Sequence, residues 1–371
     1  MLKNLYGEKR VARTQQELNV ILAAHERYAA YQGGSRAHLA HCILDGLNLA
    51  NRNLSEADFS GASLVGANLC GSNLERASLY CADLRDCNLQ SAKLSRADLR
   101  GASFSGARLA FAVLDGADLR AAMMMYVGAE GVSVIDRDGA KQSGRSRTMS
   151  GVDFSNCSMK GASFGNARLD GANFTGALLQ GASFKSAKLT NVVFKNAVLT
   201  GVNLKELDVP PAAMIGCVQD VTPQAAAKFD MLRAKLDAHQ QWIASGGAQG
   251  APAILDDEDL RPLHQLLVAR PLTGLCARRA CAIGLDFSSS QLQGAKFEGA
   301  DLRDANFTNA DLRGVSLRDA KLAHAKFERA NLGRLSLANG SVLTPDLGEV
   351  GSQEDHFRGA IFDGTHKLVA L

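Results

Sequence analysis

The chain repeats in fives over much of its length. A Leu or Phe stands at every fifth position from Leu44 to Leu119, and Ala usually stands two residues before it. This period fits neither the turn of an α-helix nor the alternation of a strand. It fits a short strand followed by a corner, in which the Leu or Phe and the Ala point inward and the residue between them points outward. Such a unit cannot bury its apolar side alone, so successive copies must coil and stack as a solenoid.

The repeats follow the pattern Ala-(Asp/Asn)-Leu-x-x, as in 57–61 (Ala-Asp-Phe-Ser-Gly) and 67–71 (Ala-Asn-Leu-Cys-Gly). The chain thereby resembles the pentapeptide-repeat family over well over half of its length. The resemblance implies a mainly β fold, a right-handed quadrilateral β-helix with four pentads in each coil. It implies less about function, because a fold alone does not settle what a protein does. Some members of the family mimic DNA and bind type II topoisomerases through their shape and an acidic surface.

Interruptions of the pattern divide the chain into segments. The register restarts between Leu204 and Phe287, whose separation is not a multiple of five, so we expect the last tract to form a separate or offset β-helical body. The predicted organisation is a capping helix (1–35), a repeat β-helix (36–208) with a projecting loop (126–150), a helical insert or second lead-in (209–285), and a second repeat tract with a C-terminal cap (286–371).

Two segments outside the repeats have the pattern of capping helices. Thr14 and Glu17 form a capping box, after which Leu18 and Leu22 lie on one helical face. The segment after Thr222-Pro223 looks like a second copy of this lead-in, although 256–270 could instead be a short helix. The matching positions are Leu22, His25, Tyr28 and Gly33-Gly34 in the first copy, and Leu236, His239, Trp242 and Gly246-Gly247 in the second.

The composition predicts a mixed surface without a large field of one sign. The chain has 41 Lys and Arg against 38 Asp and Glu, and the two signs are nearly balanced within each repeat tract. No apolar run resembles a signal peptide or approaches membrane-spanning length. The eight cysteines form no Cys-x-x-Cys pair, and several stand at inward small-residue positions, so a reducing cytoplasm fits best.

Two clusters within the repeats are candidate sites. His38, His41 and Cys42 lie close in sequence, but we expect packing or surface roles for them, because Cys42 would have to point outward to join a metal site. Four pentads per coil would stack residues twenty apart on one wall, which places Tyr80, Arg100 and Arg120 in a column. This stripe could hold nucleic acid, but the neighbouring acids favour a surface salt-bridge ladder.

The predicted function is a non-catalytic protein-interaction scaffold. We find no catalytic constellation and no pattern for a metal or other cofactor, and direct nucleic-acid binding is disfavoured. The partner would be a protein of unknown identity, and two copies of the chain could also join through the apolar C-terminal end. The alternatives are a DNA-mimicking regulator of a type II topoisomerase and a translocated bacterial effector. The predicted partner-binding residues are Arg137, Lys141, Arg145 and Arg147 on the projecting loop, and Tyr80, Arg100 and Arg120 on the column.

The centres of the second tract alternate between Phe and Leu or Met. With four pentads in each coil, Phe should therefore occupy two opposite walls. We predict one ladder of Phe154, Phe174 and Phe194, with Phe164 and Phe184 facing it, and a corresponding ladder of Phe287, Phe307 and Phe327 in the last tract.

Overall fold

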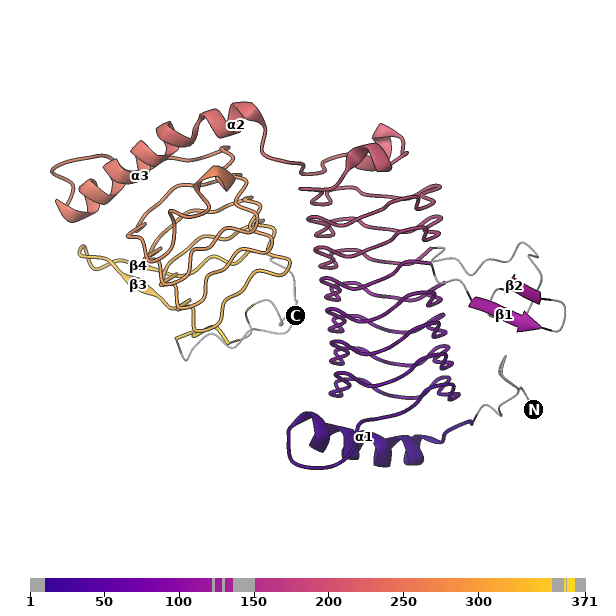
Figure 1. The fold of residues 1–371 in the computed structure, drawn as a ribbon. Coiled ribbons are helices and arrows are strands. Elements are labelled where there is room, and N and C mark those ends of the chain that lie inside the picture. The colour runs from indigo at the N-terminus through magenta and orange to yellow at the C-terminus, as the bar shows by residue number, and fades with distance from the viewer. Residues whose placement is uncertain are drawn as a thin grey trace. The chain divides into compact units, whose positions relative to one another are not determined.

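The chain divides into two compact units in a computed structural model, Met1–Asp220 (the first unit) and Val221–Leu371 (the second unit). Each unit has its own hydrophobic core. Figure 1 shows the fold of both units. The structure describes residues 11–121, 151–348, 357 and 359–363, together with the backbone of 124–128 and 131–135.

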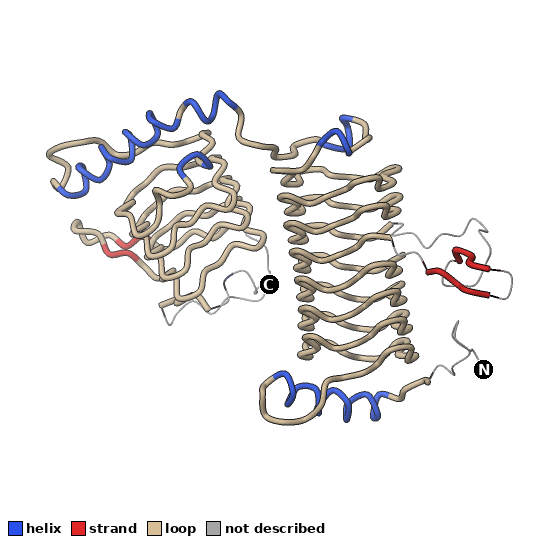
Figure 2. The backbone as a smooth tube through the Cα atoms, in the orientation of Figure 1, coloured by secondary structure: helices blue, strands red, loops and turns tan. Residues whose placement is uncertain are grey.

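The first unit is a β-helix with four walls. Parallel bridges join residues twenty apart, such as Asp58 to Ser78 and Ser78 to Asp98, so four pentads complete one coil. The amide of Phe59 donates to the carbonyl of Ser78 (2.8 Å), and the amide of Asp58 donates to the carbonyl of Ala37 (3.0 Å). Each coil is thus hydrogen-bonded to the coils on both sides, although its extended segments are too short to be drawn as strands (Figure 2).

The corners explain the polar part of the repeat. The last residue of each pentad has a positive φ, +65° at Gly61 and +57° at Asn51, a conformation that Gly and Asn adopt more readily than other residues. The carboxylate of Asp58 accepts a hydrogen bond from the amide of Ser60 (3.0 Å), which closes the turn. Asp or Asn before the central residue therefore serves the corner that follows it.

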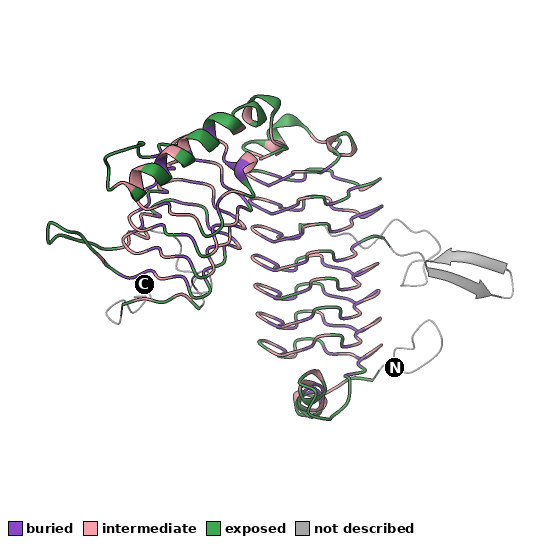
Figure 3. Ribbon diagram, turned by 60° about the vertical axis from the view of Figure 1, so that its left-hand side comes forward, coloured by how far each residue is buried: buried purple, intermediate pink, exposed green. Residues whose placement is uncertain are grey.

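The core of the first unit contains the predicted aromatic ladders. Phe174 is stacked between Phe154 and Phe194, with ring centroids 5.1 and 5.0 Å away, and Phe164 is stacked on Phe184 at 4.8 Å. The two ladders meet edge to face across the coil. The second unit repeats the arrangement, with Phe287, Phe307 and Phe327 stacked in order. The predicted ladders are confirmed, and buried residues recur along each described coil (Figure 3).

Helix α1 (Gln15–Ala29) covers the first coil. Its capping box is present: Thr14 Oγ1 accepts from the amide of Glu17, and the Glu17 carboxylate accepts from the amide of Thr14. The residues around the helix also serve backbone groups of the first coil, which no coil precedes among the described residues. The amide of Ile43 donates to the carbonyl of Val11 (2.9 Å), and the amide of Asn48 donates to the side chain of Gln15 (2.8 Å).

The β-helix of the first unit continues across an inserted segment. Bridges join Arg108 to Asp153 and Asp118 to Ser163, so the coil after the insertion stacks directly on the coil before it. The insertion contains an antiparallel hairpin of β1 (Met124–Gly128) and β2 (Gly131–Ile135). Two 3-10 helices, η1 (Leu204–Glu206) and η2 (Pro211–Met214), follow the later coils.

The second unit begins with α2 (Pro223–Ala227) and α3 (Phe229–Ala244). Its coils begin near Ile254, which bridges to Cys276, about thirty residues before the repeat pattern becomes regular at 286. The first of these coils is longer than the others by two residues, because η3 (Arg261–Leu263) lies within it. A short hairpin of β3 (Leu335–Ser336) and β4 (Val342–Leu343) follows the last regular pentads.

These first coils are hard to recognise in the sequence because, in one pentad, the large and the small inward side chains have exchanged positions. Ala277 occupies a central position and Leu275 the position two residues before it, the reverse of the usual order. Both are buried, so the wall keeps its volume while the pattern of large central residues is lost. The segment predicted as an insert or lead-in (209–285) therefore contains both helices and coils.

The predicted match of Gly246-Gly247 with Gly33-Gly34 is wrong. A side chain on Gly34 would lie 2.1 Å from the carbonyl oxygen of Ala24, and one on Gly250 would lie 2.1 Å from that of Ala238. These two glycines therefore let the chain pass close to equivalent carbonyl groups, one in the capping helix of each unit. The linker after α3 is longer than the linker after α1, so simple alignment of glycine pairs selects the wrong residues.

Candidate partner-binding face

The column predicted on the repeat wall is present in the first unit. Bridges join Ser78 to Asp98 and Asp98 to Asp118, which places Tyr80, Arg100 and Arg120 at the same corner of successive coils. We call the surface formed by these three residues the Arg column.

Aspartates beside the Arg column neutralise its arginines. Arg100 Nη2 lies 2.7 Å from Asp98 Oδ2, and its Nε lies 3.8 Å from Asp118 Oδ2. Arg120 Nη2 lies 2.6 Å from Asp118 Oδ2. Arg100 therefore contacts acids on two successive coils, which confirms the predicted salt-bridge ladder.

Pairing within the ladder favours the ionised forms of its carboxylate and arginine side chains. The hydrogen bond from Arg120, which is countered by partial burial, lowers the pKa of Asp118, and the hydrogen bond with Asp98 raises the pKa of Arg100. The guanidinium of Arg100 also lies 5.4 Å from the centre of the Tyr80 ring. The arginine side chains are about half exposed, and ion pairs this open to solvent contribute little to stability. The ladder orders side chains more than it stabilises the fold.

The Arg column leads directly into the inserted segment. Arg120 is followed by β1, which begins at Met124, so the hairpin leaves the β-helix at the corner where the column ends. The two sets of predicted partner-binding residues are therefore neighbours along the chain. The basic residues of the loop lie outside the described residues: Arg137, Lys141, Arg145 and Arg147.

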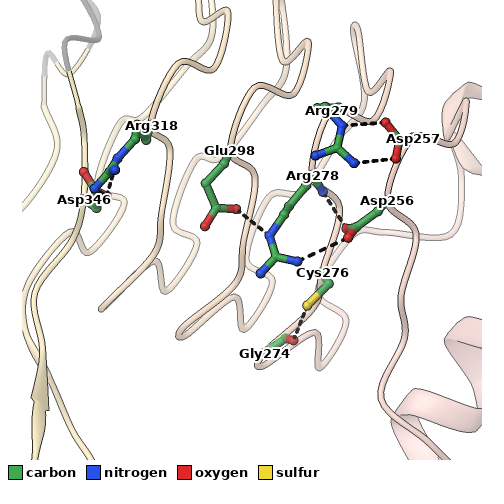
Figure 4. A network of polar contacts seen from close by, with 9 residues as sticks. All are labelled: Asp256, Asp257, Gly274, Cys276, Arg278, Arg279, Glu298, Arg318 and Asp346. Carbon is green, nitrogen blue, oxygen red and sulfur yellow. Dashed lines mark hydrogen bonds and ion pairs between the residues drawn. The ribbon is translucent and has the colours of Figure 1, made fainter.

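The second unit carries its own charged ladder, which was not among the sites predicted from the sequence (Figure 4). Arg278 lies between Asp256 (3.3 Å) and Glu298 (3.4 Å), which occupy the coils on either side of it. Next to it, Arg279 pairs with Asp257, and the hydrogen bond from Arg279 lowers the pKa of that carboxyl. Asp256 and Arg278 are 22 residues apart, whereas Arg278 and Glu298 are 20 apart, so the longer first coil hides the alternation of signs from a search at twenty-residue spacing. Opposite charges therefore alternate among the described residues of this corner.

A family model for pentapeptide repeats matches the chain in eight copies, which together span more than half of it. The chain belongs to the pentapeptide-repeat family. The matched residues are 35–62, 53–90, 82–120, 148–185, 177–209, 278–309, 286–322 and 295–334.

Several solved structures of pentapeptide-repeat proteins are similar to this chain. HetL, involved in heterocyst differentiation regulation in the cyanobacterium Nostoc sp. strain PCC 7120, is 20% identical over 90% of this chain and 100% of its own, with a TM-score of 0.24. QnrB1, a plasmid-mediated fluoroquinolone resistance protein, is 20% identical over 51% of this chain and 89% of its own, with a TM-score of 0.22. Rfr23 from the cyanobacterium Cyanothece 51142 is 20% identical over 48% and 88%, with a TM-score of 0.20. These likenesses concern the right-handed β-helix alone, and no curated protein matches significantly.

The histidines and cysteines of this pentapeptide-repeat protein do not converge on a metal site within the described residues. His38 lies 4.0 Å from Asp58, the ring of His41 lies against Gly61, and Cys42 is buried in the core. All eight cysteines are free, and burial raises the pKa of the Cys87 thiol to about 12. Among the described helices, none is both long and apolar enough to cross a membrane.

Proposed function

We propose that this pentapeptide-repeat protein is a non-catalytic scaffold that binds a protein partner through the Arg column and the inserted segment beside it. The observation that carries the proposal is the position of the insertion. The chain leaves the regular wall after Ala121 and is back in register at Asp153. Interruptions of this kind are where repeat proteins usually carry their functional residues.

The wall supplies a preorganised surface beside the insertion. The amides of Leu119 and Ala121, which flank Arg120, both donate hydrogen bonds to carbonyls of the next coil, at 2.8 and 3.1 Å. The two-pronged hydrogen bonds of Arg120 to Asp118 also fix the direction of its side chain. Because this surface is already ordered, little of its conformational entropy is lost when a partner binds, which favours binding.

The charges favour a protein partner over mimicry of DNA. A duplex mimic must present regularly spaced negative charge to a surface that binds phosphates. Here the carboxylates of Asp98 and Asp118 are both paired with arginine. We therefore expect no strong inhibition of a type II topoisomerase. Potent, stoichiometric inhibition of purified gyrase supercoiling by the full chain would contradict the proposal and favour the DNA-mimic alternative.

The test compares partner capture from the native host by the full chain, by a variant lacking 126–150, and by Arg100→Gln/Arg120→Gln. Arg313→Gln is a matched control, because Arg313 pairs with Asp311 at 2.7 Å and is similarly exposed, but belongs to the second unit. A protein that both test variants lose and the control retains is then purified and titrated directly. Its affinity for the full chain should fall with added salt, and less steeply for the double variant. Equal capture by all four proteins would refute the proposed face.

A further inference from the structure

Both units are capped by helices that bury the same set of side chains. In α1 the buried residues are Leu18, Leu22 and His25, and in α3 they are Leu232, Leu236 and His239, with the same spacing. Each histidine ring also stacks on an aromatic ring one turn later, that of Tyr28 at 5.9 Å and that of Trp242 at 5.7 Å. A buried histidine that is conserved in position between two caps of one chain has a role common to both.

That role is to accept a hydrogen bond from a backbone amide of the coil that the helix covers. The amide of Ala37 donates to His25 Nδ1 (3.1 Å), and the amide of Ala253 donates to His239 Nδ1 (3.0 Å). These amides begin the first coil of their units, and no earlier coil in the described part of the chain offers them a carbonyl. An unpaired buried amide is unfavourable, so the ring takes the place of the missing strand. Because Nδ1 accepts, the proton of each neutral ring must be on Nε2.

The surroundings favour the neutral ring in both caps. Burial lowers the pKa of His25 and that of His239. The groups that face His25 are the backbone of Ser55 and the charged side chains of Glu26, Arg36 and Glu56, whose effects oppose one another. The backbone of Leu272 and Thr273 faces His239 and offsets burial only in part. The Nε2 atoms of both rings are buried and make no hydrogen bond of ordinary geometry within the described residues.

We propose that His25 and His239 are acid-sensitive latches, and that protonation of these rings releases α1 and α3 from the first coils that they cover. A protonated ring would direct Nδ1–H at an amide N–H, so that two donors face each other and the amide loses its acceptor. It would also bury a positive charge without a contacting acid. The inference concerns the ends of the two β-helices and does not depend on the proposed partner-binding face.

The direction of the pH effect follows from the lowered pKa values. Histidine in an unfolded or released segment titrates near its ordinary value of about 6.5. Below that pH, the released cap binds a proton that the docked cap resists, so docking weakens as pH falls toward the pKa of the docked ring. Above it, both states are neutral and docking no longer depends on pH. Release exposes the amides of Ala37 and Ala253 to solvent.

The experiment uses Trp242, the only tryptophan of the chain, as a reporter of α3. Its emission is followed in the full-length protein from pH 8 to pH 4, and hydrogen exchange, corrected for the intrinsic effect of pH, is measured over 15–29 and 229–244. Both helices should lose protection below about pH 6, and Trp242 emission should change over the same interval. His239→Asn keeps an acceptor near Nδ1 but cannot titrate, so it should abolish the changes in α3 and leave those in α1.

Each cap provides the control for the other. His25→Asn should abolish the pH dependence of exchange in α1 and leave the Trp242 transition unchanged. His38→Asn removes an exposed histidine and should alter neither transition. If His239→Asn does not fold, as judged by circular dichroism at pH 8, His239→Gln takes its place, because its longer side chain also carries an acceptor that does not titrate. Unchanged transitions in the folded asparagine or glutamine variants, or full protection of both helices at pH 4, would refute the latches.

Discussion

Truncation of Phe174 to alanine tests whether stacked rings hold the first unit together. Phe174 is fully buried and touches four other rings: it is stacked on Phe154 and Phe194 at 5.1 and 5.0 Å and meets Phe164 and Phe184 edge to face at 5.7 and 5.9 Å. Removal of a buried Phe side chain costs about 3–5 kcal/mol. Because aromatic pairs contribute about 0.5–1.5 kcal/mol beyond burial, we expect the loss to lie near the upper end, about 5 kcal/mol.

Phe59→Ala is the matched control for this truncation. Phe59 is equally buried at a central position of the same unit, but it makes no ring contact with the described residues, so its loss should lie near 3 kcal/mol. Urea unfolding is followed by hydrogen exchange over 151–199 for the Phe174 variant and over 39–79 for the control. Trp242 emission reports on the second unit, whose separate core should be unaffected. A cost below about 2 kcal/mol for Phe174→Ala, or one no larger than that of Phe59→Ala, would refute the ladder argument.

Two further predictions concern a cap and the inserted segment. Gly34→Ala should weaken docking of α1 far more than Gly33→Ala, because an added Cβ meets the Ala24 carbonyl at 2.1 Å in the first case and nothing within 4 Å in the second. Both have positive φ, so the difference in urea midpoint isolates the clash, and equal midpoints would contradict it. Substitution of the basic loop residues by serine should leave thermal unfolding unchanged while it weakens partner binding and reduces its salt dependence. A lowered unfolding temperature, or unchanged affinity at low salt, would contradict this. The substituted residues are Arg137, Lys141, Arg145 and Arg147.

The sequence alone determined the features that repeat with the coil. A period of five fixes which side chains point inward, and the four pentads per coil that the family resemblance implies fix which residues are stacked. The ladder through Phe174 and the pairing of Arg100 with successive aspartates could therefore both be predicted. Each depends only on local geometry copied many times, which makes a register of this length hard to misread.

Only the tertiary structure decided what happens where the repeat begins and ends. At Leu275 and Ala277 the large and the small inward residue have exchanged positions. The first coils of the second unit therefore lack the expected pattern, although both residues are buried. Gly250 is the counterpart of Gly34 because both pass the same helix carbonyl, whatever the length of the linker. The role of His25 depends on an amide twelve residues away that has no strand to pair with. Such features satisfy particular backbone groups at the end of a stack, and a local pattern cannot show which groups those are.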